Sequence, residues 1–387
     1  AIKFSQWIIT RLNIIYENDD PKPNWLLKFN LFFESCTIHD FKDTQFAYKQ
    51  LTQRDILDDY EIDMLSVKSG SIGQVYKARH KKTNCLHAIK VKHPDLEEYM
   101  YLPRLFLNMI IKILKVLSFN KFYTPLDLDM FFRSLEEQLN FNIESSNLQT
   151  LANNFKDNYL IVVPRVINNN NDIIIMSYEE GTYFEDYEGI SEYGKFKIAI
   201  TYILFYHQCC YLDNFNHGDL HQGNWKVREL ENKKDFCLVI YDLGLCYSFT
   251  DNKPIQKFIE SWENYDMTSM GEAAYEIISS NNDVSKHPDF KEYLFKMFDD
   301  NQFKPFNLNK VLSLIYNCTR KFNLTIEYNS LNILISAGLC EQMLVKYKLM
   351  NTNITEDESE RQSTKDDSYK CQTLEYINFC QSKKVFS

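Results

Sequence analysis

The sequence predicts an α+β fold with two lobes, a small β-rich lobe followed by a larger and mostly helical one. Two β-rich segments, about Gly73–Arg79 and Cys85–Lys92, flank a polar turn and are typical of a hairpin. A short apolar strand is predicted at Phe236–Tyr241. After Gly244 the periodicity is almost entirely helical, at 254–280, 288–299, 308–320 and 328–349.

Composition excludes some classes of protein. The 387 residues have a formal net charge of −10, which argues against a nucleic-acid binder that neutralises phosphates. The ten cysteines form no C-x-x-C pair, so an intracellular, reducing location is expected. The apolar run 104–117 is too short to span a bilayer and predicts a packed helix, with an interfacial membrane helix as the alternative. Because the chain begins with Ala1, we interpret it as a fragment or processed form in which no targeting segment is visible.

Residues 1–63 are expected to form an N-terminal helical extension. Apolar residues recur at helical spacing within residues 1–16. Pro21, Pro23 and the acidic stretch Asp55–Asp63 disfavour long helices and indicate a connector. We expect the small lobe over 64–180 with inserted helices, the helical lobe over 181–350, and a polar, flexible tail over 351–387.

The first β-rich segment opens with a partial phosphate-binding loop. The run Lys68-Ser69-Gly70-Ser71-Ile72-Gly73-Gln74-Val75 is similar to the G-x-G-x-x-G-x-V loop of protein kinases, with Lys68 at the first glycine. Glycines there allow backbone N–H groups to approach phosphate oxygens. Ala88-Ile89-Lys90 then resembles the V-A-I-K strand, whose lysine contacts the α- and β-phosphates. The candidate nucleotide-binding residues in this region are Lys68, Gly70, Ser71, Gly73, Val75 and Lys90.

The next region joins the lobes. Residues 95–156 are expected to be mostly helical, and two strands are predicted at Leu160–Val166 and Asp172–Tyr178. The second strand and the residues after it resemble the gatekeeper and hinge of a protein kinase. Met176 and Tyr178 are therefore further candidates for nucleotide contacts. An amphipathic helix at 191–214 leads into the next motif.

The strongest pattern lies between Asn216 and Leu245. His217, Asp219 and Asn224 keep the spacing of H-R-D-L-x-x-x-N, and Asp242 opens an Asp-Leu-Gly triplet that matches D-F-G. Phosphoryl transfer from ATP requires a carboxylate to orient or deprotonate the acceptor and oxygen ligands to hold Mg²⁺ on the phosphates. We assign the first role to Asp219 and the second to Asn224 and Asp242. His217 and Lys90 are further candidate catalytic residues.

A family resemblance enters at this loop. His217-Gly218-Asp219-Leu220-His221-Gln222-Gly223-Asn224 resembles the H-x-D-x-H-P-G-N loop of the UbiB/ADCK family of atypical kinases, with Gln222 at the usual proline. The resemblance implies a protein-kinase-like fold in which Glu144, within Glu144-Ser145-Ser146-Asn147, pairs with Lys90. Glu144 is therefore the remaining candidate catalytic residue. It also implies that Lys3-Phe4-Ser5-Gln6 is a K-x-G-Q motif lying over the active site, with Ser5 replacing glycine and Gln138 at the place of a family glutamate.

The predicted function is Mg²⁺-dependent phosphoryl transfer from ATP or hydrolysis of ATP, with Mn²⁺ as an alternative metal. The resemblance implies a role in ubiquinone or other prenyl-lipid metabolism, a lipid or membrane-associated biosynthetic complex as partner, and a mitochondrial or membrane-associated location. A non-catalytic ATP-binding pseudokinase scaffold is the alternative, and a helical structural protein without nucleotide is the third. Turnover separates the first two readings, and nucleotide binding separates both from the third.

Overall fold

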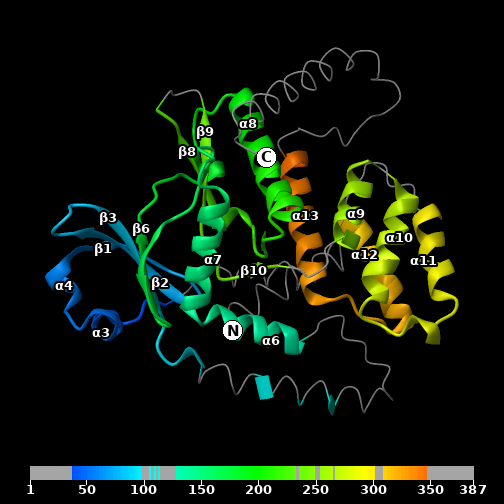
Figure 1. The fold of residues 1–387 in the computed structure, drawn as a ribbon, viewed down its shortest axis with the longest axis horizontal. Helices are drawn as coiled ribbons and strands as arrows, with labels where there is room; N and C mark the ends of the chain where they lie inside the picture. Colours follow the sequence, from blue (N-terminus) through cyan, green and yellow to red (C-terminus); the bar gives the residue numbers. More distant parts are fainter. Residues whose placement is uncertain are drawn as a thin grey trace.

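A computed structural model of the chain describes residues 37–97, 104–105, 109, 112–113, 128–231, 235–248, 253–264, 266–300 and 308–346. A small lobe built on an antiparallel sheet lies beside a larger helical lobe (Figure 1). This arrangement confirms the predicted α+β fold with two lobes. The Lys3–Gln6 motif, the helix over 1–16, the tail 351–387 and most of 104–117 lie outside the described residues.

The small lobe is organised around a five-stranded sheet of order β1-β2-β3-β6-β5. Its strands are β1 Tyr60–Ser69, β2 Gly73–His80, β3 Leu86–Lys92, β5 Val166–Asn169 and β6 Ile173–Ser177. Strand side chains alternate between the two faces. On one face Ile89, Val91 and Ile175 pack on helices α3 (Phe41–Thr52) and α4 (Ile56–Asp59).

The other face of the sheet packs on helix α7 (Phe141–Asn154) (Figure 1). Ala88 and Ile174 share a core with Phe141 and Leu148 of this helix. Because Lys90 lies two residues after Ala88 on β3, it faces the same side of the sheet as this core. The sheet therefore directs Lys90 toward α7. Helix α6 (Leu128–Gln138) precedes α7 and contacts it.

Two strands differ from the expectation. Strand β1 was not predicted, because its sequence YEIDMLSVKS shows no clear alternation of apolar and polar residues. It crosses the expected boundary at residue 63. The strand expected at Leu160–Val166 divides into β4 (Ile161–Val162), which pairs with the large lobe, and β5 in the small lobe. Pro164 lies between them and has no N–H to donate to a continuous ladder.

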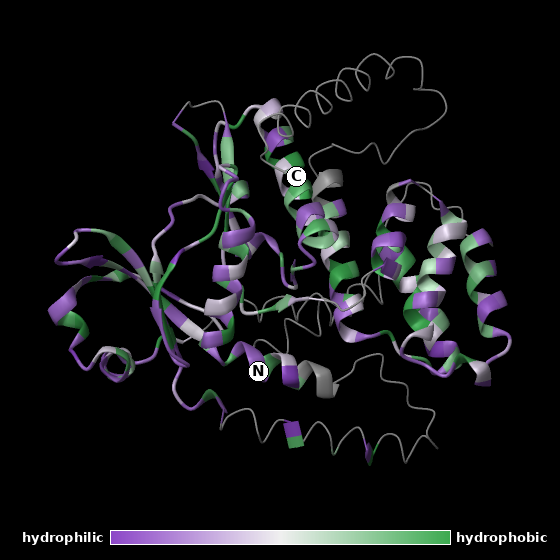
Figure 2. Ribbon diagram, in the orientation of Figure 1, coloured by the Kyte–Doolittle hydropathy of each residue, from purple (hydrophilic) through white to green (hydrophobic). Residues whose placement is uncertain are grey.

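The large lobe is a helical bundle with two small sheets. Its helices are α8 Glu192–His207, α9 Lys253–Glu263, α10 Met267–Ser279, α11 Phe290–Asp300, α12 Leu308–Phe322 and α13 Tyr328–Lys346. Figure 2 shows hydrophobic residues on α8 and α13, which pack against each other at the centre of the lobe. The single helix expected over 254–280 is two helices, because Asp266 caps α10 by accepting a hydrogen bond from the Ser269 N–H.

The two small sheets carry the motif for which a catalytic role is predicted. Strand β9 (Phe236–Ile240) is the central strand of one sheet and pairs with β4 on one side and with β8 (Trp225–Glu229) on the other. In the second sheet, β7 (Asn216–His217) pairs with β10 (Cys246–Tyr247). The loop after β7 and the triplet after β9 therefore meet at the side of the large lobe that faces the small lobe (Figure 1). None of the helices within the described residues has both the length and the apolar character required to cross a membrane.

Candidate functional site

A pocket of about 540 Å³ lies between the two lobes. It brings together residues from the small-lobe sheet, α7, the connection between the lobes and the catalytic loop. Nearly all of the predicted site residues line it: Lys68, Gly70, Ser71, Gly73, Val75, Lys90, Glu144, Met176, Tyr178, Asn224 and Asp242. Of the predicted residues, Asp219 and His217 lie outside the pocket lining.

Lys90 is held between two carboxylates. Its Nζ lies 2.7 Å from Oε1 and 2.8 Å from Oε2 of Glu144, and 3.2 Å from Oδ1 of Asp242. The Glu144 side chain is only 3% exposed, so this pair is shielded from solvent. Burial alone would lower the pKa of Lys90, but Asp242 and Glu144 outweigh burial and hold the pKa of its ammonium above the usual value. Lys90 is therefore a fixed positive charge at neutral pH.

Helix α7 fixes Glu144 and also reaches the Asp-Leu-Gly triplet. The Asn140 side chain caps the helix by accepting from the Asn142 N–H, which places Glu144 in the first turn, where the helix dipole favours a carboxylate. One turn later, Nδ2 of Asn147 donates to the Leu243 carbonyl at 2.8 Å. A shift of α7 would therefore disturb the position of Asp242 as well as the ion pair of Lys90.

Asp242 adopts a left-handed backbone conformation, with φ of 53°. Such a conformation is uncommon outside glycine, although aspartate tolerates it better than most residues. It follows directly on the buried strand β9, where Val239 and Ile240 are fully enclosed. The buried strand and this sharp change of direction turn the carboxylate toward Lys90. Backbone strain of this kind is concentrated at functional sites.

His217 connects the predicted catalytic loop to the end of strand β9 by hydrogen bonds. Its Nδ1 accepts from the Asp219 N–H at 3.1 Å, and its Nε2 lies 3.2 Å from the Tyr241 carbonyl, to which it donates. Burial lowers the pKa of His217, so the ring stays neutral and can accept at Nδ1. These contacts are with backbone groups, which are the contacts of a positioning residue that joins the loop to the end of β9.

The remaining residues of this loop include a possible metal ligand, Asn224, and a second histidine, His221. Nδ2 of Asn224 donates to the Asp219 carbonyl at 2.8 Å, which leaves the amide oxygen of Asn224 as its possible metal ligand. An amide oxygen and the carboxylate of Asp242 are hard ligands that suit Mg²⁺ bound to phosphates. The donor set thus fits the predicted metal. Nε2 of His221 lies 3.6 Å from Oδ2 of Asp219, a contact that was not predicted.

The predicted phosphate-binding loop is a tight turn between β1 and β2. Lys68 faces Val75 across the hairpin, and the Gly70 N–H donates to the Gly73 carbonyl at 2.8 Å. A Cβ at Gly73 would overlap the Val91 carbonyl of the neighbouring strand β3. A glycine at residue 73 is therefore required by the close approach of two strands, in addition to its expected role near phosphate.

The hinge end of the pocket contains aromatic residues that the sequence did not identify. Met176 and Tyr178 line it as expected, and Tyr183 and Tyr241 line it as well. The Tyr241 hydroxyl donates to the Glu179 carbonyl at 2.7 Å, which ties the hinge to the residue before Asp242. Tyr241 is the last residue of the predicted strand, so its position was available from the sequence. Tyr183 lies in no motif.

Gly218 shows why this loop has glycine after His217. A Cβ on Gly218 would overlap the ring of Tyr247, whose hydroxyl accepts from Nδ2 of Asn332 at 3.1 Å. We expect Gly218→Ala to lower the free energy of unfolding by about 1–3 kcal/mol, as overpacking in a closed core does. Urea denaturation measures this change. Gly70→Ala is the matched control, because its Cβ would meet only the Gly73 carbonyl at an ordinary 3.5 Å, and equal losses in both variants would contradict the steric argument.

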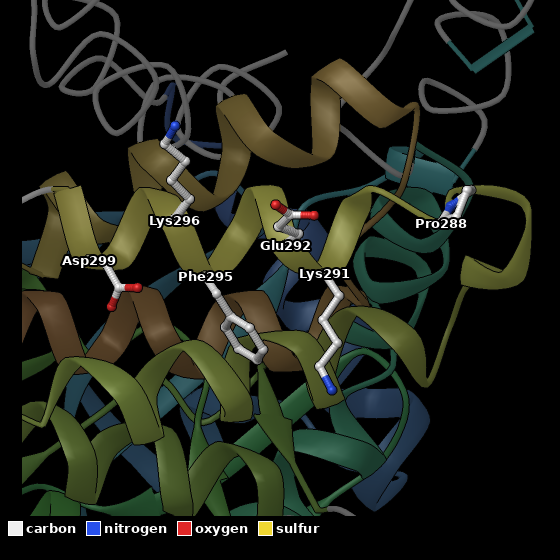
Figure 3. A pocket seen from close by; sticks show the side chains of 6 residues that line it. All are labelled: Pro288, Lys291, Glu292, Phe295, Lys296 and Asp299. Atoms are coloured by element: carbon white, nitrogen blue, oxygen red, sulfur yellow. The ribbon is translucent and has the colours of Figure 1, made fainter.

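A second hollow, of about 590 Å³, lies on helix α11 (Figure 3). Its side chains come from this helix and from a proline that precedes it: Pro288, Lys291, Glu292, Phe295, Lys296 and Asp299. Lys291 lies over the rings of Tyr275 and Phe295, at 5.2 and 5.5 Å from their centroids. None of the predicted site residues lines this hollow.

Comparisons with known proteins complete the description of the site. A family model described as an ABC1 atypical kinase-like domain matches residues 36–273. The chain is 26% identical over 233 residues to the probable serine/threonine-protein kinase abkC of Dictyostelium discoideum, with 59% of this chain and 33% of that protein covered. It is 26% identical over 216 residues to the ABC1 family protein MCP2 of Saccharomyces cerevisiae, with 52% and 38% covered.

A bacterial protein matches over a longer stretch. The chain is 22% identical over 340 residues to the probable protein kinase UbiB of Shewanella piezotolerans, with 84% of this chain and 60% of that protein covered. The chain thus spans between 33% and 60% of the length of these curated relatives. The match of the family model extends from the start of the described small lobe into α10 and includes the whole inter-lobe pocket.

Proposed function

Because the chain belongs to the family of ABC1 atypical kinase-like domains, we propose that it binds ATP with Mg²⁺ between its lobes and transfers or hydrolyses the γ-phosphate. Membership of this family confirms the resemblance to UbiB/ADCK proteins. The observation that carries the proposal is the contact of Lys90 with both Glu144 and Asp242, at 2.7 and 3.2 Å. A fixed ammonium beside a metal-binding carboxylate is the arrangement that ATP phosphates require.

Each residue has a defined part in this proposal. Lys90 contacts the α- and β-phosphates, and Glu144 keeps its ammonium in place. Asp242 and Asn224 are the proposed metal ligands, and the turn at Gly70–Gly73 covers the phosphates. When bound, Mg²⁺ neutralises part of the charge on the phosphate oxygens. Met176 and Tyr178 border the base of the nucleotide.

Asp219 is the proposed catalytic carboxylate. The hydrogen bond of its backbone N–H to His217 and that of its carbonyl to Asn224 fix the backbone on both sides of the side chain. A carboxylate held in this way can orient an acceptor hydroxyl or water and take up its proton. We propose ubiquinone or another prenyl lipid pathway as the setting of this activity, with a membrane-associated biosynthetic complex as partner, following the resemblance to UbiB.

The metal assignment is tested by Asp242→Asn. This variant keeps the shape of the side chain and removes the charge that faces the metal. We expect Mg²⁺-dependent ATP affinity, measured by calorimetric titration, to fall by about ten- to a hundredfold, and metal-free affinity to change little. Asp172→Asn is the control, because Asp172 also pairs with a lysine, Lys92 at 2.6 Å, but does not line the inter-lobe pocket. Unchanged Mg-ATP affinity in a folded Asp242→Asn variant would refute the assignment.

A further inference from the structure

Two lysines converge on one tyrosine at the hinge end of the inter-lobe pocket. Nζ of Lys226 lies 4.8 Å from the ring centroid of Tyr183, and Nζ of Lys68 lies 5.6 Å from the same centroid. Both distances are within the range of cation–π contacts. All three side chains line the pocket. We call Lys68 and Lys226 the lysine pair.

The backbone around the lysine pair is well fixed. Thr182 pairs with Val227 through a hydrogen bond of 2.9 Å from the Thr182 N–H, which holds the Tyr183 segment beside strand β8. A Cβ at Gly181 would lie 2.8 Å from Cβ of Lys226, so the stem of Lys226 packs directly on this glycine. The ammonium of Lys226 is therefore presented to the pocket by a packed stem.

The lysine pair differs in charge balance from two neighbouring cations, Lys77 in the pocket lining and Arg228 outside it. Lys77 has Glu180 at 3.5 Å, and Arg228 has Glu179 at 2.7 Å. Within the part of the chain that the structure describes, neither Lys68 nor Lys226 has a carboxylate in ion-pair contact. Burial lowers the pKa of Lys226, and the neighbouring charge of Lys68 lowers the pKa further. Two like charges thus lie within 4.8 and 5.6 Å of the Tyr183 ring centroid, and neither has a carboxylate partner among the described residues.

The lysine pair is separate from the triphosphate position. Lys68 faces Val75 on β2, and Val75 faces Lys90 on β3, so Lys68 and Lys90 are separated by two strand spacings, about 10 Å. Lys226 instead lies near Tyr241, at 5.4 Å from the ring centroid, and Tyr241 is bonded to the hinge. The lysine pair therefore lies at the base and ribose end of the proposed nucleotide, away from the phosphates that Lys90 would bind.

We propose that Lys68 and Lys226 form a second anion site, which binds a phosphate group other than the triphosphate held by Lys90. This inference rests on the proposed nucleotide site and extends it to the choice of ligand. A phosphate dianion accepts hydrogen bonds from two ammonium groups and relieves their mutual repulsion. The phosphate belongs either to the ribose of the bound nucleotide or to a separate phosphorylated molecule that enters beside it.

The first experiment compares nucleotides. ADP, 2′-phospho-ADP and 3′-phospho-ADP are titrated with Mg²⁺ into the full chain in a calorimeter. The wild type is expected to bind one of the two ribose-phosphorylated forms about tenfold more tightly than ADP, the gain expected from a charged hydrogen bond. Lys68→Met and Lys226→Met should each remove this preference, because methionine keeps the apolar stem and loses the ammonium. Lys77→Met is the matched control, since Lys77 lines the same pocket with a carboxylate partner.

The second experiment identifies the source of the phosphate. Inorganic phosphate is titrated into the chain with and without saturating Mg-ADP. Binding that persists with ADP bound and that disappears in Lys68→Met and Lys226→Met would support the site and point to a separate phosphorylated molecule. The inference is overturned if neither the preference for a ribose-phosphorylated nucleotide nor the binding of inorganic phosphate depends on the lysine pair. It is also overturned if Lys77→Met loses as much of this preference or binding as Lys68→Met and Lys226→Met do. Failure of ADP to bind would instead refute the proposed function, and the titration of phosphate alone would still test the lysine pair.

Discussion

Replacing Asp219 by asparagine is expected to lower kcat for Mg-ATP by about a hundred- to ten-thousandfold, the usual contribution of a general base. Asparagine keeps the size and polarity of the side chain and cannot accept the proton. Its backbone contacts with His217 and Asn224 remain, so the loop should keep its shape. Mg-ATP affinity should change only slightly, because the carboxylate acts on the acceptor in the transition state and not on the bound nucleotide.

The measurement is phosphate release from radiolabelled ATP, with candidate lipid and protein acceptors, beside calorimetric titration of Mg-ATP. Asp186→Asn is the control, because Asp186 is an exposed carboxylate of the same lobe that does not line the pocket. Wild-type turnover in Asp219→Asn would remove the central residue of the proposed enzyme. Tight Mg-ATP binding by a wild type that shows no turnover would favour the pseudokinase scaffold.

Sequence motifs were sufficient to predict which residues lie close together wherever those residues are neighbours in the chain or on one hairpin. The loop from His217 to Asn224 has its functional atoms within eight consecutive residues, so the pattern predicted its contents directly. Gly73 and Lys90 lie on adjacent strands of one hairpin, and their spacing fixed their relation. Glu144 was different, because it lies far along the chain from Lys90 and only the family resemblance implied a pairing.

Features that depend on tertiary packing were not accessible from the sequence. The lysine pair could not be predicted from the sequence, because Lys68 on β1 and Lys226 on β8 approach Tyr183 from two different lobes. Strand β1 was missed because its partner β2 stabilises a sequence without clear alternation. The left-handed backbone of Asp242 follows from the fold of the triplet after β9, for which the residue type alone is a weak predictor.

Because the ion pair of Lys90 and Glu144 is buried, its loss is expected to lower both the stability of the fold and the affinity for ATP. The side chains are 13% and 3% exposed, and removing one partner of such a pair lowers stability by about 3–5 kcal/mol because the other charge is left uncompensated. The third member makes the effect unequal. Without Glu144, Lys90 still has Asp242 at 3.2 Å, whereas without Lys90 two carboxylates face each other. Lys90→Met should therefore unfold at a lower urea concentration than Glu144→Gln.

For ATP, Lys90 and Glu144 should behave as one unit. We expect Lys90→Met to weaken Mg-ATP binding about a hundredfold and Glu144→Gln about tenfold, because glutamine no longer fixes the ammonium. The double variant should bind no worse than Lys90→Met, so the cycle should be non-additive by about 1–2 kcal/mol.

Affinities are measured by titration on variants shown to be folded by circular dichroism. Lys77→Met with Glu180→Gln is the control cycle, because that pair lies at the pocket rim at 3.5 Å and is more exposed, so it should be close to additive. Strict additivity for Lys90 and Glu144 would mean that Glu144 does not act on the nucleotide through Lys90.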